Sequence, residues 1–204
     1  NVVNVCMPDT YVLSAKILTA IHDCYKTAAV PFKHVHLGGD EVPEGAWLHS
    51  PACRNSECWD SSWDVSREED RKAAEATLLR HYAGEILTIV KELSPKTQAG
   101  FWHEMSPALP ATDNIYITGW ATEGADHELI TDVLARDQQL VIANASFLYL
   151  DMPYGLHVEE PGLPWAAYID TQRIHDFDPL ACWQIPDGER PLVKGIQAQL
   201  WSET

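Results

Sequence analysis

The sequence predicts an α/β protein that forms part of a (β/α)8 barrel. Two observations lead to this fold class: short apolar, β-branched runs alternate with helical patterns, and polar or aromatic side chains follow almost every run directly. In a barrel of parallel strands, the residues that follow the strands gather at one rim, where these barrels carry their active sites.

Five runs read as strands, at residues 33–37, 97–101, 114–118, 140–144 and 195–200. Apolar residues at helical spacing predict helices over residues 11–28, 68–93 and 126–137, and a short helix near 171–177. Asp9 or Thr10 is the expected N-cap of the first helix, and Ser94-Pro95 closes the second. Residues 43–67 and 145–194 are expected to be long loops.

The number of strands indicates an incomplete barrel. Five strands are too few to close a (β/α)8 barrel, so we expect residues 1–204 to be a partial catalytic barrel domain, the carboxyl-terminal part with about strands 4–8. The missing amino-terminal half would have to come from a second chain or an omitted segment, because open strand edges are unfavourable in water.

Composition excludes several classes of partner. The net charge of -16 argues against nucleic acid and anionic membrane surfaces, and no apolar run approaches the roughly 20 residues that span a bilayer. No signal peptide is visible and the chain starts at Asn1, so we expect a processed or excised piece. We expect a secreted, periplasmic or lysosomal location rather than a cytoplasmic one. Cys53 and Cys58 share one loop and can pair in an oxidising compartment, with reduced thiols as an equal alternative.

The central motif is His36-Leu37-Gly38-Gly39-Asp40-Glu41-Val42, at the end of the first strand. Because Asp40 and Glu41 are neighbours, their Cα atoms lie only about 3.8 Å apart. They cannot flank a bond from opposite sides, as two carboxyls about 5–5.5 Å apart do in ordinary retaining glycosidases. One of them can donate a proton while the other holds a group beside it.

This motif resembles the His-x-Gly-Gly-Asp-Glu signature of the family 20 glycoside hydrolases, the β-N-acetylhexosaminidases and chitobiases. Diguanylate cyclases share Gly-Gly-Asp-Glu, but there it lies on a hairpin, whereas a long helix follows here. The resemblance covers most of the chain, because further matches follow in the family's order. They are Trp102, Trp120, Tyr149-Leu150-Asp151 and Leu200-Trp201-Ser202-Glu203.

The resemblance implies a role for each matched residue. Glu41 is the expected general acid/base, Asp40 orients and stabilises the 2-acetamido group of the substrate, and Tyr149 hydrogen-bonds the acetamido carbonyl. His36 is grouped with the substrate-binding residues, as a hydrogen-bonded neighbour of the acids. The remaining substrate-binding residues are the pocket walls Trp102, Trp120 and Trp201, the hydroxyl ligands Asp151 and Glu203, and Trp165, which resembles the platform that chitobiases place beneath the next sugar.

The expected activity is therefore exo-hydrolysis of terminal β-linked GlcNAc or GalNAc on an oligosaccharide or glycoconjugate. The mechanism is retaining and substrate-assisted, with no cofactor and no metal. Two alternatives remain open. One is a metal-dependent hydrolase on the same fold, because His34 and His36 alternate on one strand and His103 follows another. The other is a catalytically silent carbohydrate-binding fragment, because the family's sugar-gripping arginine belongs to the missing strands.

Overall fold

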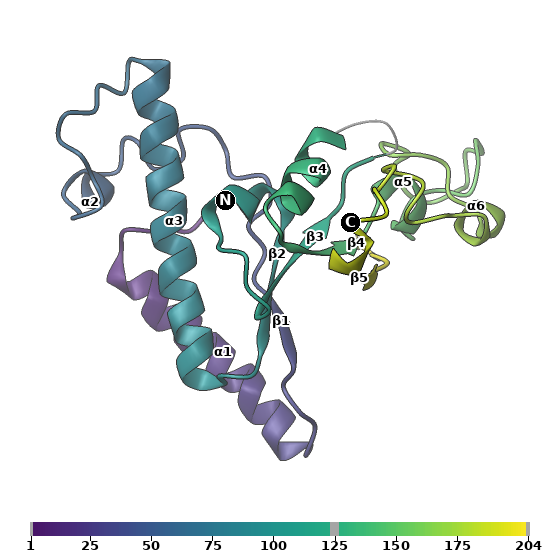
Figure 1. Ribbon diagram of the computed structural model, residues 1–204, viewed down its shortest axis with the longest axis horizontal. Coiled ribbons are helices and arrows are strands. Elements are labelled where there is room, and N and C mark those ends of the chain that lie inside the picture. The colour runs from purple at the N-terminus through teal and green to yellow at the C-terminus, as the bar shows by residue number, and fades with distance from the viewer. Residues whose placement is uncertain (1, 123–126, 203–204) are drawn as a thin grey trace. The chain divides into compact units, whose positions relative to one another are not determined.

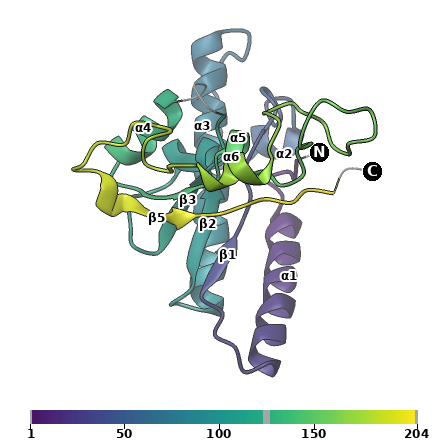
Figure 2. The ribbon, with the colours of Figure 1, turned by 90° about the vertical axis from the view of Figure 1, so that its right-hand side faces the viewer.

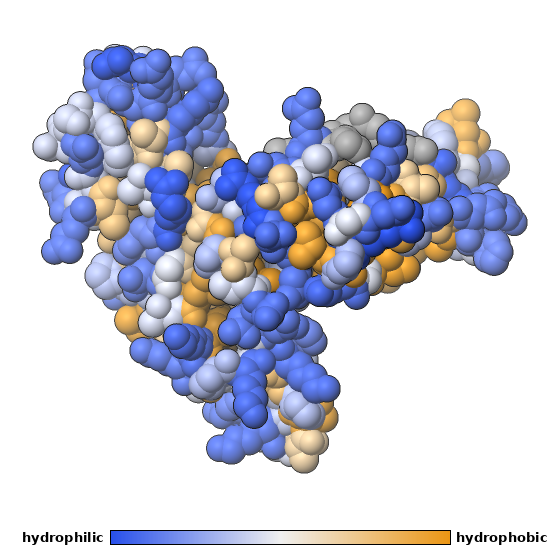
Figure 3. Space-filling view, in the orientation of Figure 1, coloured by the Kyte–Doolittle hydropathy of each residue, from blue (hydrophilic) through white to orange (hydrophobic). Residues whose placement is uncertain are grey.

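The computed structural model describes residues 2–122 and 127–202 (Figure 1). They form two compact units. The first unit consists of residues 1–100 and 104–110, and the second of residues 101–103 and 111–204. Most of the surface seen in Figure 3 is hydrophilic, in keeping with the net charge of -16.

Two long helices lie side by side in the first unit (Figure 1). Helix α3 spans Glu68–Leu93, as the sequence predicts, and three acidic residues in its first turn suit the positive end of the helix dipole. Helix α1 spans Pro8–Thr27. Its N-cap is Met7 rather than the predicted Asp9 or Thr10, because Pro8 occupies the first helical position, where a missing N–H costs nothing.

One face of α1 carries large apolar side chains that remain exposed. Leu18 is buried, whereas the i, i+4 series of Leu13, Ile17, Ile21 and Tyr25 is between 38% and 56% exposed. We call these four residues the α1 stripe. The helical period is as predicted, but the described residues leave this face largely uncovered; the Tyr25 ring packs against that of Phe32, with the centroids 5.1 Å apart.

A disulfide ties the long loop of residues 43–67 to the segment before α1. Cys6 is bonded to Cys53, with Cα atoms 5.0 Å apart, and Cys58 is a free thiol. The predicted alternatives, a Cys53–Cys58 pair or reduced thiols, are therefore wrong for Cys53. The loop also contains the short helix α2 (Pro51–Arg54), and Trp47 is buried with its Nε1–H donating to the Val3 carbonyl at 2.9 Å.

In the first unit, two parallel strand segments pair. Strand β1 (His34–His36) lies beside residues 98–100 of β2 (Gln98–Trp102), with His36 opposite Gly100. After β2, the 3-10 helix η1 (His103–Ala108) takes the place of a covering helix, because the link to the next strand is short and contains Pro107.

The second unit is built on three further parallel strands. Strand β4 (Gln139–Ile142) lies between β3 (Ile115–Gly119) and β5 (Val193–Ile196). Beyond β5, Gln199 continues the pairing, because its N–H donates to the Leu148 carbonyl. The helical elements are α4 (His127–Ala135), α5 (Ala145–Leu148), α6 (Thr171–His175) and η2 (Arg190–Leu192), and α5 and α6 are in contact (Figure 2).

Candidate active site

The acid pair sits on an unusual turn at the end of β1. Residues 38–41, which we call the acid turn, have left-handed backbone at Gly38 (φ 75°), Gly39 (φ 96°) and Glu41 (φ 47°). Glycine adopts such angles freely, but a residue with a Cβ pays about 1–2 kcal/mol. Strain of this kind at Glu41 is typical of functional sites.

The side chains of His36 and Met105 lie against the acid turn. The Gly38 N–H donates to Nδ1 of His36 at 3.2 Å. At Gly39 the backbone passes so close to the buried Met105 that an added Cβ would lie 2.3 Å from Met105 Cγ. The glycine pair is therefore needed both for its backbone angles and, at Gly39, for its lack of a side chain.

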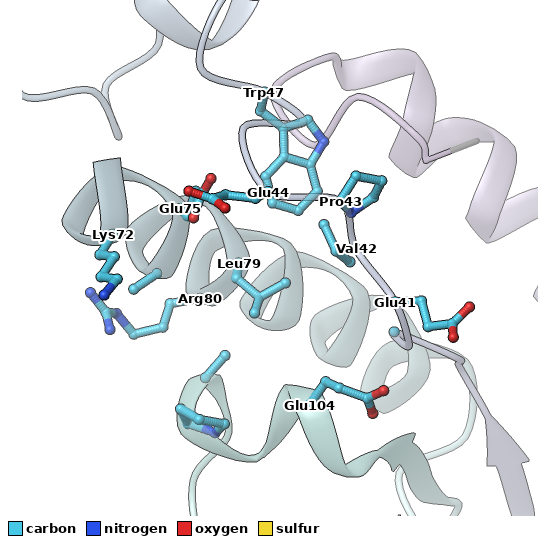
Figure 4. A pocket seen from close by; sticks show the side chains of 14 residues that line it. Glu41, Val42, Pro43, Glu44, Trp47, Lys72, Glu75, Leu79, Arg80 and Glu104 are labelled. Carbon is cyan, nitrogen blue, oxygen red and sulfur yellow. The ribbon is translucent and has the colours of Figure 1, made fainter. Parts of the chain in front are cut away.

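The acids themselves are exposed and line two cavities of the first unit. Asp40 lines a cavity of about 190 Å³. Glu41 lines a cavity of about 360 Å³ between the loop after β1, helix α3 and η1 (Figure 4). In this view the carboxylates of Glu41 and Glu104 turn to the same side, away from Lys72 and Arg80.

The charged side chains around the Glu41 cavity are mostly paired with neighbours. Glu75 accepts a hydrogen bond from the Gly45 N–H, which fastens the loop to α3. Lys72 pairs with Glu68, one turn away on the same helix, with Nζ and Oε1 2.5 Å apart. Glu41 therefore sits on a loop that is fastened to α3, and it forms no ion pair with any residue that the structure describes.

The aromatic residues named from the sequence form one connected cluster in the second unit. The ring centroid of Tyr149 lies 5.6 Å from that of Trp165 and 6.3 Å from that of Trp201. Trp102 lies 6.3 Å from Trp201. Trp120 lies 6.0 Å from Trp165. Tyr149 is buried at the Gln199 pairing, whereas about half of Trp165 and Trp201 is exposed. Indole and phenol rings arranged in this way suit the apolar faces of a pyranose.

Asp151 stands beside this cluster. One of its carboxylate oxygens accepts the backbone N–H of Trp201 at 3.3 Å. Both residues line a cavity of about 580 Å³ in the second unit. Glu203, the other predicted hydroxyl ligand, lies outside the described residues.

Several residues at these sites received no sugar-binding role from the sequence. His103 is buried with its ring 5.7 Å from that of Trp120, and it follows Trp102 directly, so its place after a strand was a usable signal. Tyr154 and Glu160 line the same cavity as Asp151, and Glu160 accepts the Tyr154 N–H at 3.1 Å. They lie in a long loop without any periodic pattern, so no sequence signal pointed to them.

The described residues contain neither a metal-binding cluster nor a membrane-spanning helix. No group of three or more His, Cys, Asp or Glu side chains is arranged there to hold a metal ion, so the metal-hydrolase alternative finds no support in residues 2–122 and 127–202. Nor does any helix in that part of the chain combine the length and apolar character that crossing a bilayer requires.

Parallel strands followed directly by carboxylates in the first unit and by aromatic side chains in the second are typical of the class of α/β barrel enzymes, whose active-site residues follow the strands. Comparison with known proteins agrees. The chain belongs to glycosyl hydrolase family 20, whose catalytic-domain model matches residues 1–204. The resemblance drawn from the motifs is thereby confirmed.

Individual relatives show the same likeness over part of their length. A beta-hexosaminidase of Vibrio furnissii is 26% identical over 208 residues, which cover 100% of this chain and 30% of that protein. The N,N'-diacetylchitobiase of Vibrio harveyi is 24% identical, over 99% of this chain and 27% of that protein. The chain thus spans about 30% or less of the length of these curated relatives.

Solved structures support the fold. The GH20 exo beta-N-acetylglucosaminidase of Vibrio harveyi, solved in complex with N-acetylglucosamine, superposes with a TM-score of 0.68 at 28% identity, covering 98% of this chain and 28% of that one. The Streptomyces coelicolor GH20 beta-N-acetylhexosaminidase gives a TM-score of 0.67 at 21% identity. The prediction of a TIM-barrel-type α/β domain is confirmed at that level.

Proposed function

We propose that the protein containing this chain is an exo-β-N-acetylhexosaminidase that works by a retaining, substrate-assisted mechanism. The observation that carries the proposal is the placement of Asp40 and Glu41 as neighbours on the strained acid turn after β1. Neighbouring carboxylates cannot act as acid and nucleophile from opposite sides of a bond, so the nucleophile must come from the substrate. The names of the Vibrio relatives and the N-acetylglucosamine complex support this choice of sugar.

In the first step, the acetamido oxygen of the bound sugar attacks the anomeric carbon. The bond to the leaving oxygen breaks, and Glu41 gives its proton to that oxygen. Asp40 stabilises the positive charge that develops on the cyclised amide. In the second step, water adds to the anomeric carbon, its proton returns to Glu41 and the acetamido group is regenerated with the configuration retained.

The second unit supplies the groups that hold the sugar. The buried Tyr149 donates its hydroxyl to the acetamido carbonyl. Asp151 and Glu203 accept hydrogen bonds from sugar hydroxyls, and the half-exposed Trp165 carries the next sugar of the chain. Trp102, Trp120 and Trp201 wall the pocket, which keeps water from the reacting carbon.

We further propose that the chain corresponds to about strands 4–8 of the barrel and that an amino-terminal half completes it. Two observations support this: the chain covers only about 30% of its Vibrio furnissii relative, and the α1 stripe is exposed. A helix face of this kind normally packs against a neighbouring element. The completing half would also supply further sugar-binding side chains.

We place the protein outside the reducing cytoplasm, as a secreted, periplasmic or lysosomal enzyme. The Cys6–Cys53 disulfide supports this placement, because structural disulfides form and persist in oxidising compartments.

The test is a comparison of variants in the full-length protein on two substrates. Glu41→Gln removes the proton donor, so hydrolysis of chitobiose should fall by about 10²–10⁴-fold, with a smaller loss on p-nitrophenyl β-GlcNAc, whose leaving group needs little protonation. Asp40→Asn should impair both substrates equally. Glu44→Gln is the matched control, because Glu44 is an exposed acid that lines the same cavity as Glu41.

Two results would count against the proposal. Unchanged chitobiose turnover in Glu41→Gln would show that Glu41 is not the general acid. Equal rescue of the Asp40 and Glu41 variants by the activated substrate would show that the two roles are wrongly divided. Inhibition by a thiazoline mimic of the cyclised intermediate tests the substrate-assisted route independently, and p-nitrophenyl β-GalNAc tests the choice of sugar.

A further inference from the structure

His36 makes a contact that bears on how the acid turn is held. It is the last residue of β1, and the backbone ladder continues one step further, from the Leu37 N–H to the Gly100 carbonyl at 2.8 Å. At the next residue the ladder stops, and the Gly38 N–H turns back to Nδ1 of His36 at 3.2 Å. A side chain thus replaces the neighbouring strand as the acceptor at the point where the chain leaves the sheet.

The direction of this hydrogen bond determines the state of the imidazole ring. A backbone N–H can only donate, so Nδ1 must present a lone pair. The ring is then neutral, with its proton on Nε2. If Nδ1 also carried a proton, its N–H would face the Gly38 N–H across the same 3.2 Å, and neither group could accept a hydrogen bond.

The surroundings of His36 favour the neutral ring. Its side chain is half-buried and Nε2 is inaccessible to water. Burial lowers the pKa of His36 below its ordinary value of 6.5, and the Asp40 carboxylate on the same loop acts in the opposite direction. The residue opposite His36 in β2 is Gly100, which carries no charge, and η1 contributes Glu104, which lines the Glu41 cavity.

We propose that His36 is a positioning residue: the unprotonated Nδ1 of its neutral ring anchors the acid turn and so sets the direction in which Asp40 and Glu41 leave β1. Protonation of Nδ1 releases the anchor. His36 then acts on the reaction through the turn and touches no substrate atom, unlike the substrate-binding role expected from the sequence. The catalytic part of this proposal rests on the proposed function.

Two amide variants of the full-length protein separate the anchor from a general packing role. In His36→Asn the amide oxygen occupies the δ position, where Nδ1 accepts the Gly38 N–H. In His36→Gln the same group lies one bond further out. We expect His36→Asn to keep kcat within about threefold and His36→Gln to lose about tenfold in kcat at nearly constant KM, as for the loss of one hydrogen bond that positions the catalytic acids.

The pH profile of kcat/KM separates the two roles, because a residue that only packs would leave the profile unchanged. Because asparagine does not titrate, the acid limb of kcat/KM should shift to lower pH in His36→Asn. Equal losses in both variants, or an acid limb that stays in place, would overturn the proposal.

Nitrogen NMR of 15N-histidine-labelled wild-type protein tests the tautomer without any assay of activity. The expected result at pH 7.5 is a protonated Nε2 and an unprotonated Nδ1, and a proton on Nδ1 would overturn the anchor. The His36→Asn spectrum assigns the signal. If the wild-type protein hydrolyses no N-acetylhexosaminide, the proposed function fails while this measurement still decides the anchor.

Discussion

Replacing Gly39 by alanine tests whether the close approach at the acid turn is a real constraint. The added Cβ would lie 2.3 Å from Met105 Cγ and 2.9 Å from its sulfur. Non-bonded carbons are comfortable at about 3.5–4.0 Å, so one of the two groups must move by roughly 1 Å. Met105 is fully buried, so it can move only by disturbing its own neighbours.

The expected cost has two parts. The left-handed backbone at Gly39 costs about 1–2 kcal/mol once a Cβ is present. Overpacking against Met105 adds about 1–3 kcal/mol. Gly38→Ala is the matched control, because Gly38 has φ 75° and nothing within 4 Å of a new Cβ, so only the first part applies.

The assay is urea unfolding of the full-length protein, together with kcat/KM. We expect the free energy of unfolding to fall by about 2–5 kcal/mol in Gly39→Ala and by about 1–2 kcal/mol in Gly38→Ala. In a Met105→Ala background, which opens space, the cost of Gly39→Ala should drop to that of Gly38→Ala. Equal costs for the two glycines, or full additivity with Met105→Ala, would refute the reasoning.

Three further predictions concern stability and the second unit. Reduction of the Cys6–Cys53 disulfide, which spans a sequence separation of 47, should lower the free energy of unfolding by about 4 kcal/mol in urea, whereas Cys24→Ser, at an exposed free thiol, should leave it unchanged. Because burial lowers the folded-state pKa of His36, the unfolded chain binds more protons than the folded one just below pH 6.5. The free energy of unfolding should therefore fall as the pH drops from about 6.5, and it should fall less in His36→Asn. An equal fall in that variant would contradict the assignment. Gly162→Ala should raise KM, because at φ 103° its Cβ would lie 2.3 Å from the rigid Asp151 carbonyl; an unchanged KM would show that the loop adjusts freely.

Much of the fold was predictable from local patterns. The sequence correctly places both ends of α3, because a run of acids opens the helix and Ser94-Pro95 closes it. The strands were found within one or two residues at most ends, since each coincides with a short run rich in apolar residues. The aromatic cluster follows from the same rule, because residues after parallel strands meet at one edge.

The errors arose where distant segments meet. Cys53 pairs with Cys6 across 47 residues, whereas proximity in sequence offered only Cys58 as a partner, with reduced thiols as the equal alternative. The left-handed angle at Glu41 was also beyond prediction, because glutamate has no preference for it and the surrounding contacts impose it. Helical spacing identified the α1 stripe as an apolar face but could not say what covers it.

The α1 stripe has a practical consequence for laboratory work. Four large hydrocarbon and aromatic groups in a row on a water-facing helix form the kind of adhesive patch that draws molecules into dimers and precipitates. A recombinant fragment limited to residues 1–204 would self-associate through this patch. Purification and crystallisation are therefore best begun with the intact polypeptide.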